Sequence, residues 1–141
     1  MTSEQIELVQ RAWGRVTALN NTYVQEVYAE LFRLSPELIN LFPDPAGMPV
    51  AKVSDTLNTV ITSLEQLDAL RFIIRDLGRR HQKFKVQSHQ FALLKQALTL
   101  VLARRLGEHF TPALSDAWSQ MYDEIAALML EGLSQPTESV A

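Results

Sequence analysis

His81 is the residue whose chemistry and position in this sequence are most informative. Leu70, Ile74 and Leu77 recur every three or four residues, and His81 takes the next step of the same stripe. On a helix this spacing puts them on one face, so the imidazole points where the leucines point. A neutral histidine held there by one hydrogen bond is a good axial ligand for an iron porphyrin. A core histidine with a satisfied hydrogen bond is the alternative, and for an isolated helix it is the commoner case.

The other two histidines lack such a setting. His89 follows Ser88 in the first turn of an expected helix, and His109 lies in a break after Gly107. We expect both on the surface. The sequence contains no cysteine, which excludes disulfides, thiolate ligands and thiol catalysis.

Composition limits the possible classes of protein. The 141 residues suit one domain, and the net charge of −3 offers no global basic field for nucleic acid. No run is long enough to span a membrane, and the start lacks the pattern of a signal peptide. We therefore expect a cytoplasmic protein with one domain over residues 1–134, a flexible tail over residues 135–141, and neither nucleic acid nor membrane as partner.

The segments that position His81 are predicted to be helices. Each long segment repeats its apolar residues at the helical period, and none alternates with period two. The sequence predicts an all-α fold of about seven helices that cross at steep angles. The expected helix starts are Thr2 with Gln5, Ser88, and Thr111 with Pro112, and Gly107 is an expected end.

Four motifs in order make the chain resemble a globin over about residues 4–131. The motifs are Leu41-Phe42 after Ser35-Pro36-Glu37-Leu38, then Leu77-Gly78-Arg79-Arg80-His81, then Val86 with Phe91, and finally Ala117-Trp118-Ser119-Gln120-Met121-Tyr122. They are similar to the family's haem-stacking phenylalanine, its proximal-histidine helix, the apolar residues after that histidine, and the start of its last helix. Among globins, the chain is most similar to bacterial single-domain globins and neuroglobin-like chains.

The resemblance implies haem b with His81 as the proximal iron ligand. The second ring nitrogen of His81 would donate to a backbone carbonyl one turn back, that of Leu77, which fixes the tautomer. Phe42 would lie against the porphyrin. The apolar shell would come from Val53, Leu57, Leu77, Val86, Phe91, Leu94 and Ile125, for which plain core packing is the alternative.

On the distal side the sequence departs from the family. An alignment without gaps up to His81 puts Pro49 where many globins carry a distal histidine or glutamine, and Val53 where they keep an apolar residue over the iron. Proline has no side-chain donor and no N–H. Tyr28 matches the second-helix tyrosine of many bacterial globins and becomes the candidate donor to bound gas. The alternative is a boundary tyrosine bonded to a backbone carbonyl or water.

Lys52 has three interpretations. It is a surface lysine, a partner of a haem propionate at the pocket rim, or a sixth iron ligand after losing its proton. The thioether of Met48 is a further candidate for the sixth position.

The proximal side lacks the residues that flavohaemoglobins use to push electron density onto iron. Phe91 stands at the tyrosine position, and the glutamate position falls near Leu133. Glu131 is two residues out of register, about 200° around a helix. We therefore expect a neutral, globin-like proximal histidine.

The resemblance implies reversible binding of oxygen, carbon monoxide or nitric oxide. Nitric oxide dioxygenation would need an external reductase, because the sequence has no Gly-x-Gly-x-x-Gly run for a nucleotide cofactor. The alternative is an internally six-coordinate haem protein in redox chemistry or signalling. A globin fold without haem, used as a sensor or scaffold, is a third interpretation.

Overall fold

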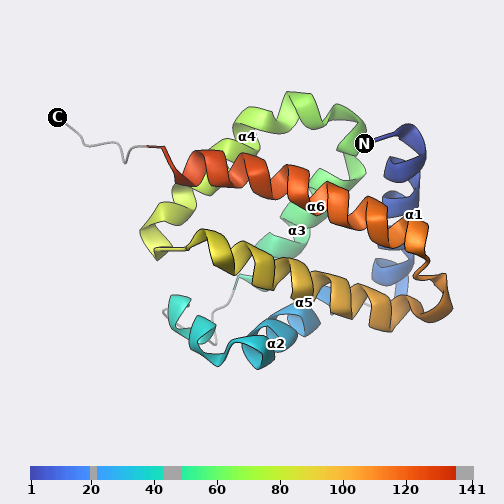
Figure 1. Cartoon of the computed structure of the whole chain (residues 1–141), viewed down its shortest axis with the longest axis horizontal. Helices are drawn as coiled ribbons and strands as arrows, with labels where there is room; N and C mark the ends of the chain where they lie inside the picture. Colours follow the sequence, from blue (N-terminus) through green and yellow to red (C-terminus); the bar gives the residue numbers. More distant parts are fainter. Residues whose placement is uncertain (20–21, 43–48, 136–141) are drawn as a thin grey trace.

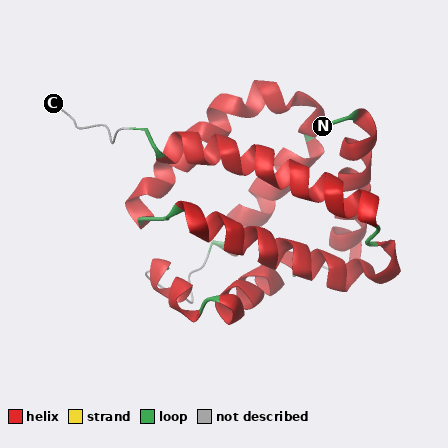
Figure 2. Cartoon of the chain, in the orientation of Figure 1, coloured by secondary structure: helices red, strands yellow, loops and turns green. Residues whose placement is uncertain are grey.

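The computed structural model describes residues 1–19, 22–42 and 49–135, and Figure 2 shows helices and loops in this part. The α-helices are α1 (Ser3–Leu19), α2 (Tyr23–Leu34), α3 (Val50–Thr62), α4 (Leu67–Arg80), α5 (Ser88–Leu106) and α6 (Pro112–Leu133). The 3-10 helices are η1 (Pro36–Leu41), η3 (Leu64–Gln66), η4 (His81–Phe84) and η5 (Gly107–His109). The predicted all-α class is confirmed.

Local sequence signals explain several helix ends. At the start of α1, the Thr2 N–H donates to Gln5 Oε1 at 2.9 Å and the Gln5 N–H donates to Thr2 Oγ1 at 3.1 Å. At the start of α6, Thr111 Oγ1 accepts from the Leu114 N–H at 3.2 Å. Gly107 follows α5 with φ 54°, a conformation that glycine adopts without steric cost. These three predicted boundaries are confirmed.

The start of α5 differs from the prediction by one residue. Its cap is Gln87 rather than Ser88, and the Gln87 N–H donates to Gln90 Oε1 at 2.8 Å. The Gln87 side chain accepts from the Gln90 backbone in return. Two glutamines thus form the reciprocal pair that a serine would form with a glutamate.

Two helix pairs form most of the frame (Figure 1): α4 packs along α6, and α2 packs along α5. Helix α1 contacts both α5 and α6, and α3 contacts α1 and α2. Among the described residues, α3 approaches α4 and α5 at few points. Helix α3 is therefore held mainly against α1 and α2.

The buried core lies mainly among α1, α2, α5 and α6. Its polar atoms are mostly paired: Tyr23 Oη donates to the Leu98 carbonyl at 2.7 Å, and Trp13 Nε1 donates to Asn58 Oδ1 at 3.0 Å. The Nε1 of Trp118 is buried without an acceptor in the described part of the chain. The largest side chains exposed by less than 2% are Trp118, Tyr23, Ile61, Ile74, Leu102, Val9, Val16 and Val101.

None of the described helices combines the length and the apolar character needed to cross a bilayer.

Candidate haem site

His81 stands at the junction of α4 and η4 and is half-buried. Its Nδ1 lies 2.6 Å from the carbonyl oxygen of Leu77, one helical turn earlier. Because a carbonyl only accepts, Nδ1 carries the proton and Nε2 holds the lone pair. No described residue hydrogen-bonds Nε2, although the ring of Phe84 lies edge-on at 6.0 Å. The imidazole is thus oriented through one nitrogen and able to bind a metal through the other.

Helix α4 is held against α6 by an unusually close approach of the two backbones. A Cβ on Gly78 would overlap the Met129 carbonyl, and a Cβ on Gly132 would overlap the Arg75 carbonyl. Beside this crossing, Arg75 Nε pairs with Glu131 Oε2 at 2.6 Å. The helix that carries His81 therefore rests directly on the backbone of α6.

Gln82, the residue after His81, adds a second attachment to α6. Its Nε2 donates to the carbonyls of Leu133 at 3.0 Å and Gln135 at 2.6 Å, and lies 3.4 Å from that of Gly132. The carbonyls of Gly132 and Leu133 belong to the last turn of α6, and Gln135 follows two residues after its end. Gln82 thus fixes the chain on the C-terminal side of the candidate ligand.

An aromatic cluster joins the end of η1 to α2. The Phe42 ring meets Tyr28 edge-on at 5.4 Å and Phe32 edge-on at 5.6 Å, and the latter two rings stack at 6.1 Å. Edge-to-face pairs at such distances are favourable beyond the area they bury. The structure thus brings together Tyr28 and Phe42, two of the predicted site residues.

The hydroxyl of Tyr28 differs from those of the other two tyrosines. Tyr23 donates to the Leu98 carbonyl and Tyr122 to the Phe91 carbonyl, whereas no described residue accepts from Tyr28. Burial raises the pKa of Tyr28, so this phenol remains a protonated donor at neutral pH. A half-buried donor without an acceptor is what a ligand-stabilising tyrosine requires.

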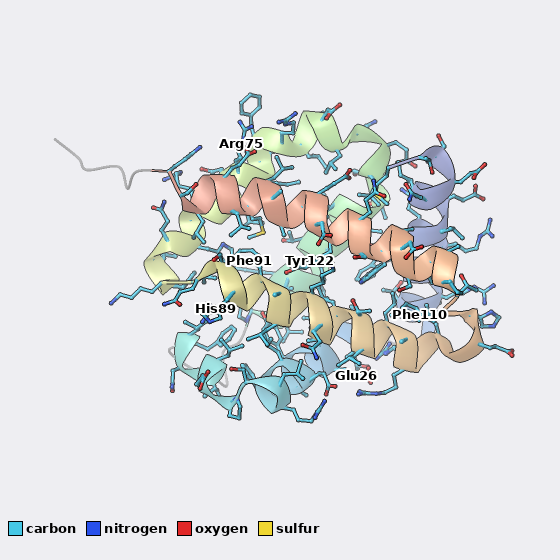
Figure 3. The ribbon with its side chains drawn as sticks, in the orientation of Figure 1. Glu26, Arg75, His89, Phe91, Phe110 and Tyr122 are labelled. Atoms are coloured by element: carbon cyan, nitrogen blue, oxygen red, sulfur yellow. The ribbon has the colours of Figure 1, made fainter. Side chains whose placement is uncertain are left out.

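The predicted apolar shell is less buried than the core. Phe91 is 9% exposed, and its carbonyl accepts from Tyr122 at 2.5 Å, between α5 and α6 in Figure 3. The other members are half-buried: Val53, Leu57, Leu77, Val86, Leu94 and Ile125. These apolar side chains are partly exposed to solvent, so an apolar group bound against them would bury their remaining surface favourably.

At the start of α3, Pro49 is the exposed N-cap residue, and its carbonyl accepts from the Val53 N–H at 3.0 Å. Lys52 lies in the first turn and is exposed, with no ion pair to a described residue. Met48 lies outside the described residues.

The remaining predictions concern residues that do not contact Nε2 of His81. His89, at the start of α5 (Figure 3), and His109 are both exposed, as expected. Glu131 is engaged by Arg75, and Leu133 is half-buried. In the described part of the chain, no three His, Asp or Glu side chains gather to hold a metal ion by themselves.

These residues fit a haem whose iron is bound by a single histidine. The imidazole is oriented by Leu77, its second nitrogen is available, and the predicted shell is apolar and partly open. The sequence did not predict the contacts of Gln82 or the close crossing of α4 and α6 at Gly78 and Gly132. Two glycines inside helical patterns were the signal for that crossing.

Comparison with known proteins agrees with this geometry. Residues 25–129 match the family model described as Globin. The chain is 28% identical to neuroglobin of Tetraodon nigroviridis, covering 100% of this chain and 98% of the relative. It is 27% identical to neuroglobin-1 of Oncorhynchus mykiss, covering 98% and 96%, and 26% identical to neuroglobin of Chaenocephalus aceratus, covering 100% and 98%. With three quarters of its length matched by the family model, the chain belongs to the globin family, whose members bind haem.

Proposed function

We propose that this globin binds haem b through Nε2 of His81 and reversibly binds oxygen or another diatomic gas on the opposite side. The observation that supports this most is the 2.6 Å contact of His81 Nδ1 with the Leu77 carbonyl, which leaves Nε2 available. When bound, haem supplies an iron centre with a site for one small gas molecule.

The residues of the chain would hold, orient and shield this group. The carbonyl of Leu77 fixes the tautomer of His81 and makes the imidazole a better donor to iron. Phe42, held by two edge-on ring contacts, would pack against the porphyrin. Tyr28 would donate its hydroxyl to the bound gas, because no described residue accepts that proton.

Optical spectra of the haem-loaded protein test the assignment of His81. We expect the reduced protein to have a five-coordinate spectrum that shifts on addition of carbon monoxide. His81→Gly should lose that spectrum and regain it with added imidazole, whereas His89→Gly, at an exposed histidine, should leave it unchanged. A His81→Gly protein with the wild-type spectrum would contradict the assignment, and a chain that stays colourless with ample haem would overturn the proposal. Nitrate formation from nitric oxide can be measured on the same sample with a separate reductase.

Internal six-coordination has less support. Lys52 is exposed, so its amine would have to turn inward and lose its proton before binding iron. Low-spin bands in both oxidation states, abolished by Lys52→Ala or Met48→Ala, would establish this alternative instead.

A further inference from the structure

Charge is distributed unevenly along the chain. Six of its thirteen Lys and Arg residues but only two of its sixteen acidic residues lie between Leu67 and Lys85. This segment, α4 with η4, therefore carries +4 in a chain of net charge −3, and the remainder carries −7. One edge of an acidic protein is thus basic.

The same segment exposes apolar side chains. Phe72 is 77% exposed, Ile73 61% and Phe84 40%. They are three of the five large hydrophobic residues found exposed in the described part of the chain. We define the α4–η4 face as these three residues together with Arg71, Arg80, Lys83 and Lys85.

Cations approach the two aromatic rings of this face. Lys83 Nζ lies 5.1 Å from the Phe84 ring centre, and Arg75 approaches the Phe72 ring at 5.8 Å from the side next to α6. Asp76, one of the two acidic residues of the segment, is paired with Arg79 at 2.7 Å and Arg80 at 3.2 Å. The other, Asp68, is exposed in the first turn of α4.

Three further cations, Arg71, Lys83 and Lys85, are exposed and have no carboxylate partner among the described residues. The face is therefore an apolar patch within a net positive field.

The shape of the α4–η4 face favours a partner with a flat surface. Helix α4 forms an outer edge of the molecule (Figure 1), and its packing surface is turned toward α6. Phe72 and Ile73 project from this ridge, and a rigid protein partner would need a matching groove to receive them. A lipid headgroup layer is deformable and accepts a projecting aromatic and aliphatic pair directly.

We propose that the α4–η4 face docks this protein on an anionic membrane surface. Phe72 and Ile73 enter the boundary between headgroups and acyl chains, while Arg71, Lys83 and Lys85 lie near the lipid phosphates and carboxylates. Our expectation from the sequence of no membrane partner considered only spanning segments. Docking at the surface requires exposed side chains rather than a spanning helix.

Sedimentation of the haem-loaded protein with vesicles tests this proposal. At about 100 mM salt we expect binding to vesicles of phosphatidylserine with phosphatidylcholine, and little binding to phosphatidylcholine alone. Phe72→Ser with Ile73→Ser should weaken binding about tenfold by removing apolar contact. Arg71→Gln with Lys83→Gln should weaken it by about tenfold by removing charge.

Matched variants control for general effects. Ile39→Ser with Leu100→Ser removes two hydrophobic residues of 40% and 38% exposure outside the face, and Arg11→Gln with Arg15→Gln removes two cations from α1. Both pairs should bind vesicles as the wild type does. Equal losses in control and test pairs, or binding indifferent to Phe72 and Ile73, would overturn the proposal. A wild-type protein that ignores vesicles but binds polyglutamate would overturn it too, and would indicate an acidic protein partner. The gas-binding spectrum is independent of these outcomes.

Discussion

The hydroxyl groups of the three tyrosines meet different surroundings, and this difference is informative at the scale of single residues. Tyr23 and Tyr122 each donate to a backbone carbonyl, and their hydroxyls are part of the folded core. Tyr28 has no acceptor among the described residues, while its ring is held by Phe32 and Phe42. The ring is therefore positioned by packing, and the hydroxyl is available to a ligand.

Tyr28→Phe should speed oxygen dissociation about tenfold or more. A hydrogen bond to a partly charged ligand contributes about 1–3 kcal/mol, and the substitution keeps the ring contacts. Carbon monoxide, which accepts hydrogen bonds weakly, should respond less. Stopped-flow dissociation rates measure both gases. Tyr122→Phe is the control, because it should lower the free energy of unfolding and leave gas dissociation unchanged. Unchanged oxygen release in Tyr28→Phe would exclude a donor role for this hydroxyl.

Part of the candidate site could be predicted from sequence because it depends on local geometry. A histidine one turn after Leu77 on a helix can reach only a few acceptors, and the predicted contact of its ring with the Leu77 carbonyl is confirmed. The role of Lys52 could not be fixed in this way, because a flexible exposed side chain has several possible partners. The bond from His81 to iron stays a prediction.

At the scale of elements, the crossing of α4 and α6 depends on two residues without side chains. Gly78→Ala should lower the free energy of unfolding by about 1–3 kcal/mol or more, because its Cβ would overlap the rigid carbonyl of Met129. Gly14→Ala on α1 is a matched control with no atom within 4 Å, and it should raise stability by about 0.5–1 kcal/mol. Urea unfolding measures both. A neutral Gly78→Ala would show that the two backbones can separate at little cost.

Gln82→Ala should loosen the attachment of η4 to α6. Loss of its hydrogen bonds to the Leu133 and Gln135 carbonyls should cost about 1–2 kcal/mol and speed amide hydrogen exchange in η4. Gln25→Ala, at an exposed position of α2 without a hydrogen-bonded side chain among the described residues, should change neither property. Equal exchange rates in wild type and Gln82→Ala would mean that packing alone holds η4.

These element contacts were hard to predict for a physical reason. Considered within its own helix, Gly78 only lowers helix stability, because glycine has a low helix propensity. Its advantage, a close approach of the two backbones, exists only when α6 packs against it. Gln82 is likewise an ordinary polar residue until the end of α6 is placed beside it. Helix types and several ends follow from neighbours in sequence, whereas these contacts join residues about 50 positions apart.

At the scale of the whole molecule, average properties hide local ones. The net charge of −3 excludes a globally basic protein, yet it conceals a +4 segment that becomes one outer face when α4 packs on α6. The predicted all-α class needed only the helical period. Which helix face remains open could not be predicted, because Phe72 and Ile73 adjoin the apolar stripe and would be assigned to the core.

The buried tyrosines make the stability of the whole molecule sensitive to high pH. Burial raises the pKa of Tyr23 and Tyr122 above the ordinary value of 10.0. Between that value and the higher folded-state values, unfolded chains lose the phenolic protons while folded chains keep them. The free energy of unfolding is therefore unaffected by these groups below about pH 10 and falls above it, by up to about 1.4 kcal/mol per pH unit for each tyrosine. Urea unfolding at pH 9 to 11.5 should show this decline, and Tyr23→Phe with Tyr122→Phe should flatten it while lowering stability at neutral pH. A decline of equal slope in that double variant would assign the alkaline sensitivity to other groups.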